Sequence, residues 1–546
     1  MTQKNKTNAF VKAAKFRAYS VTENGATALA TTGSILVDQF GKAGNFRGRP
    51  IDAVFYDMDK LWEENPQSAL RFPFYLRLIT RKTRIDKGVK TEKVQKGQGA
   101  RDEAFKRLLW LARFHKDEFA RNIAILPIVG SWKDMWSLLY YDITEGTHAI
   151  DENLIFSLLK LGLENELHVD LVKKFMPRIK SSSKCNTEWT LNMNMFAKRF
   201  AKYLRVPYTK YNKLKASGTA HDFQKLICNG KYEELDWNKI PGRALSLLAS
   251  GNFLKRHNLV NSYQDWIDKQ DVAPFVGYPC ELYKRFRNMS SLSYTLSKTI
   301  DKQFDGLVKK AEADGKVTEN VLVGLDTSGS MMTHIKGLSN YYCLDMAVSL
   351  ALFFAKLNKG AFHNKVMMFD NVSTPFDLPS ESFTTNAKAL PHVGCGGTNF
   401  QSIIDELVKI RVQNPQIPLE DYPKTILVVS DMQFNPISRN WGWTSIPITE
   451  KATNAEYSRN KLKEVFPSEF VDSMKFVWWD CAGRGTNTYE GESDNGQDFF
   501  FSGFDGSILT FLIGAEEKEN TTQSTKLTAE DVALNALNQE ILSYVN

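Results

Sequence analysis

The chain has 546 residues, which is too long for one ordinary hydrophobic core, so two or more domains are expected. Its hydrophobic content of 42%, with 12% aromatic residues, excludes a largely disordered protein. No stretch reaches the roughly 18 consecutive apolar residues of a membrane span, and the basic N-terminus lacks the apolar segment of a secretory signal. We therefore expect a cytoplasmic protein with no membrane partner.

The net charge of +8 is unevenly distributed along the chain. Residues 1–310 contain 52 Lys and Arg against 32 Asp and Glu, whereas the remaining residues contain 18 against 30. This division is typical of two domains with different partners, and a basic domain suits a polyanion. The six cysteines form no CxxC pair, so we expect free thiols in a reducing compartment.

The N-terminal part of the chain, residues 1–315, is predicted to be almost wholly helical. Phe105, Leu108, Leu109 and Ala112 recur at the spacing of an amphipathic helix, and similar segments follow one another with short breaks between them. Many helices of similar length favour a stack of helical hairpins of the HEAT kind, whose repeat is about 40 residues. An irregular helical bundle is the alternative.

Residues 319–515 show a different pattern, in which short apolar runs alternate with helical stretches. This alternation predicts an α/β domain with a doubly wound, Rossmann-like sheet of parallel strands. Helical patterns occupy 342–357, 401–412 and 455–465. A polar linker and a last helix, with its N-cap expected at Thr528, occupy residues 516–546. The runs of buried-strand type begin at Val321, Val366, Ile426, Phe476 and Phe499.

Oxygen-bearing side chains follow two of the predicted strands. Asp326-Thr-Ser-Gly-Ser330 comes directly after the first strand, Thr398 precedes a helix, and Asp431 follows the run at Ile426. In an open α/β sheet, ligands bind beyond the carboxyl ends of the strands, where the strand order switches. Hard cations prefer such oxygen ligands. We predict a site for Mg²⁺, or alternatively Mn²⁺, formed by Asp326, Ser328, Ser330, Thr398 and Asp431.

This set resembles the metal-ion-dependent adhesion site (MIDAS) of the von Willebrand factor A domain, whose pattern is DxSxS, then Thr, then Asp. The resemblance implies that a partner's carboxylate fills a free coordination position, so that the site would bind an acidic protein partner. The alternative is that Asp326 and Ser328 serve only as loop and capping residues. No HExxH motif, P-loop or further carboxylate cluster indicates an enzyme.

Three stretches of the helical part carry a second resemblance: residues 24–40, Tyr75-Leu-Arg77 with Lys96–Asp102, and Leu126–Asp134 with its Gly-x-Trp-x-Asp core. Together they are similar to the TROVE module shared by telomerase-associated, Ro-autoantigen and vault proteins, in a branch that pairs this module with a von Willebrand A domain. The resemblance implies a ring of HEAT-like repeats whose basic hole and rim take single-stranded RNA ends and structured small RNAs. It therefore implies a non-enzymatic ribonucleoprotein component.

A basic segment supports RNA binding independently, because residues 171–215 contain twelve basic residues and a single acid, Glu188. On a helix, Phe196, Phe200 and Tyr203 would share a buried face and leave a cationic strip on the other. Such a strip can follow a phosphate backbone. The predicted RNA-binding residues are Lys173, Lys174, Arg178, Lys180, Lys184, Lys198, Arg199, Lys202, Arg205, Lys210, Lys213 and Lys215.

Three tyrosines within this segment, Tyr203, Tyr208 and Tyr211, are candidates for stacking on unpaired bases. The alternative for the tyrosines is that Tyr203 belongs to the core and that Tyr208 and Tyr211 are only half exposed. The alternative for the strip is an ordinary solvated helix face. The leading hypothesis is thus a protein that binds small non-coding or single-stranded RNA. The second is a metal-dependent protein-interaction scaffold without RNA.

Overall fold

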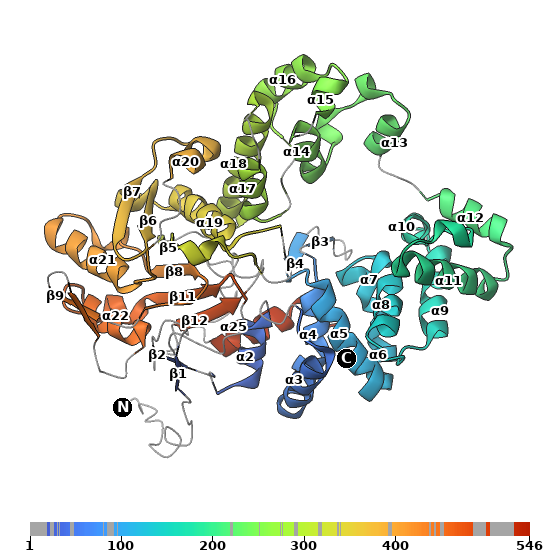
Figure 1. The fold of residues 1–546 in the computed structure, drawn as a ribbon, viewed down its shortest axis with the longest axis horizontal. Helices are drawn as coiled ribbons and strands as arrows, with labels where there is room; N and C mark the ends of the chain where they lie inside the picture. The colour runs from blue at the N-terminus through green and yellow to red at the C-terminus, as the bar shows by residue number, and fades with distance from the viewer. Residues whose placement is uncertain are drawn as a thin grey trace. The chain divides into compact units, whose positions relative to one another are not determined.

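The computed structural model describes residues 19–21, 27–29, 31, 33–43, 48–79, 81–84, 92–95, 97–218, 222–250, 252–272, 275, 277–288, 293–314, 319–335, 338, 340–390, 396–435, 438–441, 444–447, 453–483, 498–502 and 529–546 (Figure 1). They divide into two compact units. The helical unit comprises Gly48–Leu235 and Leu534–Asn546, and the α/β unit comprises Met1–Arg47 and Asp236–Ala533.

The helical unit follows the predicted hydrophobic periodicity. In α5, Phe105, Leu108 and Leu109 are fully buried and Ala112 is 2% exposed, as the expected apolar stripe requires. The end of the chain belongs to this unit, because Gln67 Nε2 donates a 2.9 Å hydrogen bond to the carbonyl of Val545. Its helices are α3 (Ile51–Glu64), α4 (Pro66–Arg77), α5 (Arg101–Phe114), α6 (Lys116–Asn122), α7 (Leu126–Val129), α8 (Trp132–Thr144), α9 (Glu152–Glu164), α10 (Val169–Phe175), α11 (Glu188–Tyr203), α12 (Tyr208–Ala216) and α13 (Asp222–Cys228).

Two short antiparallel hairpins depart from the expectation of an almost wholly helical N-terminal part. β1 (Tyr19–Val21) pairs with β2 (Thr27–Leu29), and β3 (Arg81–Arg84) pairs with β4 (Glu92–Gln95). The second hairpin lies in a Lys-rich stretch whose strands lack an apolar face, so that hydrophobic periodicity gives no strand signal there.

The second chain segment of the α/β unit, which starts at Asp236, begins with five α-helices in its described residues. They are α14 (Gly242–Ser250), α15 (Phe253–Arg256), α16 (Val260–Lys269), α17 (Pro279–Arg287) and α18 (Tyr294–Asp314). α17 packs on α19 (Cys343–Leu357), where Arg287 Nε donates to Asp345 Oδ1 at 2.7 Å. The two compact units divide at residue 235, whereas the sequence places a domain boundary near residue 315. α17 and α18 pack on α19 and α20 (Phe383–Ala389), and α14 and α16 pack on α18.

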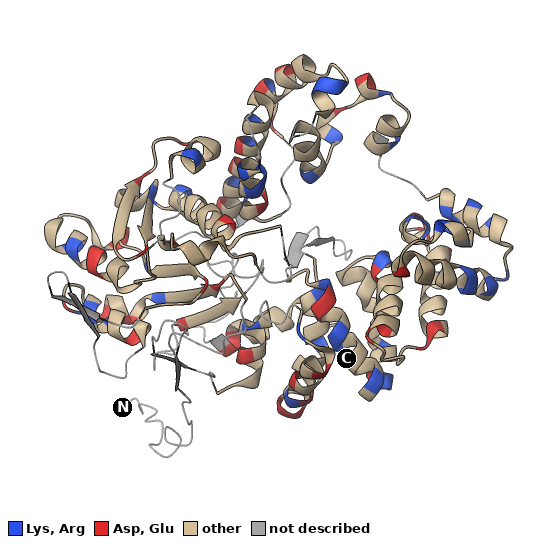
Figure 2. Cartoon of the chain, viewed as in Figure 1, with Lys and Arg blue, Asp and Glu red and all other residues tan. Residues whose placement is uncertain are grey.

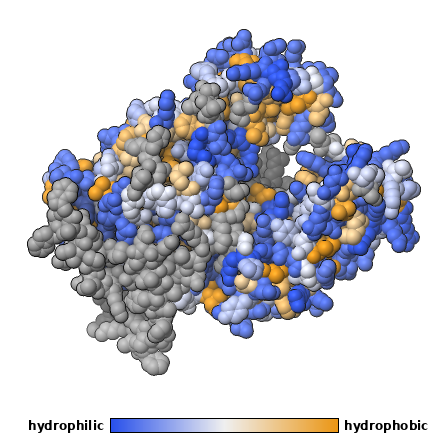
Figure 3. All heavy atoms as spheres, in the orientation of Figure 1, coloured by the Kyte–Doolittle hydropathy of each residue, from blue (hydrophilic) through white to orange (hydrophobic). Residues whose placement is uncertain are grey.

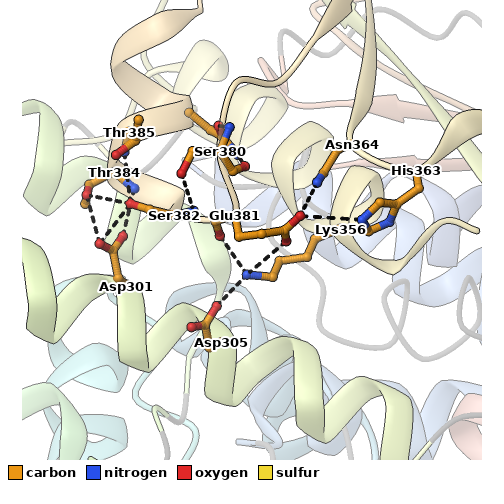
Figure 4. Close-up of polar contacts among 11 residues, drawn as sticks. Asp301, Asp305, Lys356, His363, Asn364, Ser380, Glu381, Ser382, Thr384 and Thr385 are labelled. Carbon is orange, nitrogen blue, oxygen red and sulfur yellow. Dashed lines mark hydrogen bonds and ion pairs between the residues drawn. The ribbon is translucent and has the colours of Figure 1, made fainter.

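α18 holds the α/β part through polar contacts as well (Figure 4). The carboxylate of Asp301 accepts hydrogen bonds from the Thr384 amide at 2.8 Å and from the Ser382 hydroxyl at 2.9 Å. These bonds satisfy donors at the start of α20, which has Ser382 as its N-cap. One helical turn further on, Asp305 forms a 2.7 Å ion pair with Lys356 of α19. α18 thus spans two helices of the α/β part.

The described residues form a central sheet of six strands in the order β12-β11-β8-β5-β6-β7. All neighbours are parallel except β6 and β7. From β5 the chain moves to one side of the sheet, through β6, and later returns to the other side at β8. The strand order therefore switches between β5 and β8. The strands are β5 (Val321–Asp326), β6 (Lys365–Phe369), β7 (Ser373–Asp377), β8 (Thr425–Ser430), β11 (Lys475–Asp480) and β12 (Asp498–Ser502).

Alternate residues of the central strands face opposite layers of helices, as a sheet buried on both faces requires. Leu322, Ile426, Val428 and Trp478 belong to the hydrophobic core on one face. α21 (Gln401–Gln413), α22 (Asn454–Leu462) and α23 (Ser468–Ser473) supply this core with residues, while α19 packs against β5, β6 and β8. The expected α/β architecture with a mainly parallel sheet is confirmed.

Several elements were not predicted. β7 is an exposed antiparallel edge strand that contains Pro375, and a strand of this kind lacks the apolar run of a buried one. β9 (Ser438–Trp441) and β10 (Thr444–Pro447) form a further hairpin. α2 (Ile35–Gly41) lies in the part predicted to be helical, but its packing on β12 of the sheet was not predicted; the rings of Phe40 and Phe501 are 6.5 Å apart.

The last helix, α25 (Ala529–Leu537), lies where a helix was expected, whereas its predicted cap Thr528 and the polar linker lie outside the described residues. None of the helices in the described part of the chain combines the length and hydropathy needed to cross a bilayer.

Candidate metal centre and basic surface

The loop after β5 brings three of the five predicted ligands together. Asp326 is fully buried, and its Oδ1 accepts a 2.9 Å hydrogen bond from the amide of Ser328. The hydroxyl oxygens of Ser328 and Ser330 lie 3.1 Å apart. Two oxygens bound at about 2.1 Å to adjacent positions of an octahedral Mg²⁺ ion would be separated by about 3 Å. The spacing of these two hydroxyls therefore fits one edge of a magnesium coordination shell.

The register of the sheet places the fourth predicted ligand beside this loop. Leu325 of β5 pairs with Val429 of β8, so Asp326 and Asp431 both leave the sheet at the same edge, where the strand order switches. Asp431 is 1% exposed. The residue after it, Met432, has a φ of 62°, a left-handed conformation that turns the chain sharply at this point.

The fifth predicted ligand, Thr398, lies in a loop that is fixed to both neighbouring strand ends. The amide of Asn435, beyond β8, donates a 2.9 Å hydrogen bond to the carbonyl of Thr398. On the β6 side, the amide of Asn399 donates to the carbonyl of Asp370 at 2.7 Å, and Asn371 Oδ1 accepts from Gly397 at 2.9 Å. Thr398 itself is 2% exposed. The structure thus brings the loops that carry all five predicted ligands to one edge of the sheet.

Two glycines allow this close approach. A Cβ atom on Gly396 would lie 2.7 Å from the Asp370 carboxylate, and one on Gly397 would lie 2.6 Å from Asn435 Nδ2. With a larger residue at either position, the side chain of Asp370 or Asn435, or the Thr398 loop itself, would have to shift. The absence of a side chain at Gly396 and Gly397 therefore serves close packing as well as loop flexibility.

The electrostatics of the centre are dominated by burial. Burial raises the pKa of the Asp326 carboxyl to about 6, hydrogen bonds from Ser430 and Ser328 oppose this rise, and the negative charge of Asp431 adds to it. Two buried carboxylates at one edge repel each other, and a divalent cation between the loops would offset that repulsion. The donor set of two carboxylates and three hydroxyls fits a hard cation.

No group of three or more His, Cys, Asp or Glu suited to a metal ion occurs among the described residues. The predicted centre contains only two such residues, so any cation there would depend on hydroxyl ligands and water.

Ser430 is a residue of this centre that was not predicted. Its hydroxyl donates a 2.6 Å hydrogen bond to Asp326 Oδ2 and accepts one of 3.1 Å from the amide of Met432. It thereby orients the second carboxylate oxygen of Asp326, whose first oxygen accepts from the Ser328 amide. The only sequence signal for Ser430 was that it directly precedes Asp431. A Ser-Asp pair is too common in proteins to indicate a role.

Two buried thiols lie next to the centre. Cys481 follows β11 and its Sγ donates to the carbonyl of Ser430 at 3.1 Å, while Cys343 begins α19. Burial raises the pKa of Cys481 well above its ordinary value, so this thiol is protonated at neutral pH. The five described cysteines are free thiols, and Cys395 lies outside the described residues.

The predicted basic residues of the helical unit lie on α10, α11, α12 and the connections between them, where Figure 2 shows Lys and Arg gathered. Four are half-buried, namely Lys173, Lys174, Lys198 and Lys215. The other eight are exposed, namely Arg178, Lys180, Lys184, Arg199, Lys202, Arg205, Lys210 and Lys213.

Two of these cations already have protein partners. Arg199 forms an ion pair with Glu152 of α9. Lys215 Nζ donates to the carbonyl of Lys174 at 2.7 Å and to that of Lys173 at 3.3 Å, so it caps the C-terminal end of α10. Lys215 therefore has a structural role in addition to its charge.

The exposure of the aromatic side chains in residues 171–215 differs in part from the prediction. Phe196 and Phe200 are fully buried, as predicted, but Tyr203 is 36% exposed and stacks on Phe200 with ring centroids 6.3 Å apart. Tyr208 is 50% exposed. Tyr211 is fully buried, and its hydroxyl donates to the carbonyl of Pro177 at 3.1 Å. The candidate role of Tyr211 in base stacking is wrong, because its ring faces the core between α10 and α12.

Two of the three stretches that carry the TROVE resemblance meet at one buried carboxylate in the helical unit. Asp134 Oδ2 accepts from Arg77 Nε at 2.9 Å and from the Ser131 amide at 2.7 Å, while its Oδ1 accepts from Arg101 Nε at 3.0 Å. Asp134 is also the N3 residue of the capping box that starts α8. These motif residues therefore hold α4, α5 and α8 together.

Comparison with known proteins gives two similarities. Residues 320–542 match a family described as a domain of unknown function (DUF7788). The chain is also 21% identical over 540 residues to an uncharacterized protein of Acanthamoeba polyphaga mimivirus, a similarity that covers 91% of this chain and 85% of the viral protein. The viral similarity thus extends over both units, whereas the family match is restricted to residues from β5 onward.

Proposed function

We propose that this protein binds small non-coding or single-stranded RNA without catalysis, through a HEAT-like helical unit of the TROVE kind. We further propose that the α/β unit is a von Willebrand factor A-type domain that holds Mg²⁺ or Mn²⁺ at a MIDAS-like centre. The observation that carries the RNA assignment is the set of eight exposed cations between Arg178 and Lys213, in a segment with one acid. Such a surface suits phosphates.

The cation assignment is supported by the convergence of five oxygen-bearing residues at the switch in strand order. The Ser328 and Ser330 hydroxyls have the spacing of adjacent octahedral ligands, and Asp326 and Asp431 supply two negative charges. A bound cation would supply Lewis acidity and a position for an anionic ligand. Asp326, Ser328, Ser330, Thr398 and Asp431 are the residues that would hold it.

Recognition of RNA by this surface depends on charge and shape. The cations come from exposed helix faces and loops, so their contacts would be with phosphates, and affinity should fall as salt rises. Exposed Tyr203 and Tyr208 lie in the same segment and offer ring faces to unpaired bases. This combination favours single-stranded or locally unpaired RNA.

The test is a charge reversal on α11 and the residue just beyond it. In one variant Lys198, Arg199, Lys202 and Arg205 are changed to Glu. A matched control carries the same four charge reversals elsewhere on the helical unit, at Lys60, Arg113, Lys116 and Arg121, which are exposed. The readouts are the RNA that copurifies, identified by sequencing, and the salt dependence of binding to a labelled single strand.

The strip variant should lose the copurified RNA, and the slope of log affinity against log salt should fall by about 3, because a single strand releases roughly 0.7 counterions per phosphate contact. The control should bind as the wild type does. Equal binding by both variants would refute the assignment of the strip. Absence of RNA from the wild-type protein would favour the alternative, a metal-dependent protein scaffold, whose acidic partner should dissociate when EDTA is added.

A further inference from the structure

A cavity of about 480 Å³ opens on the helical unit between α7, α8, α9 and α10. Trp132, His168 and Phe175 line it, together with aliphatic side chains. Figure 3 shows hydrophobic residues exposed among hydrophilic ones on this unit. Three side chains of the cavity are exposed to an unusual degree for their type: Ile128 at 49%, Leu161 at 60% and Leu171 at 47%. An open apolar cavity of this volume has the size of a small-molecule site.

The aromatic side of the cavity is preformed by packing. The rings of Trp132 and His168 lie 5.5 Å apart at an angle of 57°. A Cβ atom on Gly162 of α9 would lie 2.5 Å from the Trp132 ring, so only glycine lets α9 approach the indole this closely. The indole is therefore held in position before any ligand arrives, which lowers the entropy cost of stacking a ligand on it.

Positive charge adjoins the cavity at the C-terminal end of α10. Lys174 Nζ lies 5.5 Å from the centroid of the Phe175 ring, which forms part of the lining. Lys215 Nζ is bonded to the carbonyl of Lys174 at 2.7 Å. Burial lowers the pKa of Lys215, and the positive charge of Arg178, which lies three residues after Phe175 in the chain, lowers it further. Phe175 thus separates an apolar cavity from a group of cations.

This arrangement indicates the chemistry of the ligand. An apolar cavity with aromatic walls favours a flat ring, and cations beside it favour a phosphate next to that ring. The polar side chains of Asn165 and His168 also line the cavity and can bond to the polar edge of a base, whereas an aliphatic chain would leave them without a partner from the ligand. A nucleotide unit combines all of these features.

We propose that the cavity takes one unpaired base of the bound RNA, stacked among Trp132, His168 and Phe175, with the adjoining phosphate at Lys174 and Arg178. This proposal rests on the RNA-binding function proposed above. It adds an apolar base-binding cavity to a surface on which Tyr203 and Tyr208 are the exposed rings already proposed to contact bases. It also predicts a preference for single strands over duplexes, because a paired base cannot enter.

The experiment uses the full-length protein and a short fluorescein-labelled oligoadenylate, with a matched duplex and an oligonucleotide carrying abasic positions as comparison ligands. Trp132→Leu removes the stacking surface. Ala124→Phe fills the mouth of the cavity from an exposed lining position, so that it leaves the core untouched. Trp189→Leu is the control, because Trp189 packs on Tyr140 outside the cavity.

Both cavity variants should bind the oligoadenylate roughly tenfold more weakly, the loss expected for one stacked base, with an unchanged salt slope. The abasic ligand should not distinguish them from the wild type, and Trp189→Leu should bind as the wild type does. Unchanged affinity in both cavity variants, alongside loss of binding in the charge-reversal variant, would overturn the base subsite and leave the RNA-binding function intact.

Two other outcomes would also overturn the proposal. If the wild type binds no oligonucleotide, the RNA-binding function and the subsite both fail. If Ala124→Phe loses a protein that the wild type retains after nuclease treatment, and oligonucleotide affinity does not change, the cavity binds a protein segment instead of a base.

Discussion

The Ser430 hydroxyl donates a 2.6 Å hydrogen bond to Asp326 Oδ2 across the two strands where the order of the sheet switches. Both residues are fully buried. Because the other oxygen of Asp326 accepts from the Ser328 amide, the carboxylate is held in one orientation by two donors. Each oxygen keeps a lone pair for a further interaction. The proposed cation would therefore meet a carboxylate that is already oriented.

The first prediction concerns this orientation. Ser430→Ala should weaken Mn²⁺ binding roughly tenfold or more, because groups that orient metal ligands have effects of this size. Isothermal titration with MnCl₂ measures the change. Ser458→Ala is a matched control, since Ser458 is also fully buried and its hydroxyl bonds the carbonyl of Asn454 within α22. Equal Mn²⁺ affinity in the two variants would show that Ser430 has no role in binding.

The second prediction concerns removal of the cation. EDTA should lower the thermal unfolding temperature of the wild type, because a ligand at about one hundred times its Kd contributes about 2.7 kcal/mol. Asp326→Ala should unfold at the same temperature with Mg²⁺ or with EDTA. If the wild-type unfolding temperature does not respond to Mg²⁺, Mn²⁺ or EDTA, the centre does not bind a divalent cation.

The third prediction concerns the buried ion pair of the helical unit. Asp134→Asn should destabilise this unit by about 3–5 kcal/mol, because it leaves the guanidinium of Arg77, 2% exposed, without its counter-charge. Arg101→Gln should cost far less, since the side chain of Arg101 is 40% exposed. Urea unfolding monitored by hydrogen exchange in α4 and α8 would measure both. A loss for Asp134→Asn no larger than for Arg101→Gln would contradict this account.

The fourth prediction separates two tyrosines of the basic segment. Tyr211→Ala should destabilise the helical unit by about 3–5 kcal/mol, because it removes a fully buried ring and leaves the Pro177 carbonyl without its donor. Tyr208→Ala should leave the stability unchanged and weaken single-strand binding. Thermal unfolding and fluorescence anisotropy measure the two effects. If Tyr208→Ala binds normally, this ring takes no part in recognition.

Local sequence patterns were sufficient to predict an element where its residue types occur mainly in one environment, such as the buried core. The apolar run at Val321 could only be a buried strand among helical stretches, and the stripe of Phe105, Leu108 and Leu109 could only face a core. The edge strand that contains Pro375 gave no such signal, because an exposed strand needs no apolar run. Tyr211 also could not be placed, since a tyrosine among lysines suits a core and a surface equally well.

The sequence alone determined that an α/β domain follows a largely helical part, because hydrophobic periodicity is a local property that survives without knowledge of the fold. It also placed Asp326 and Asp431 after strands. Only the tertiary structure decided that α17 and α18 pack on α19 and α20, that Ser430 reaches Asp326, and that Asp134 joins Arg77 to Arg101. These relationships depend on which elements lie side by side, and contacts between residues far apart in the chain leave no periodic trace in the sequence.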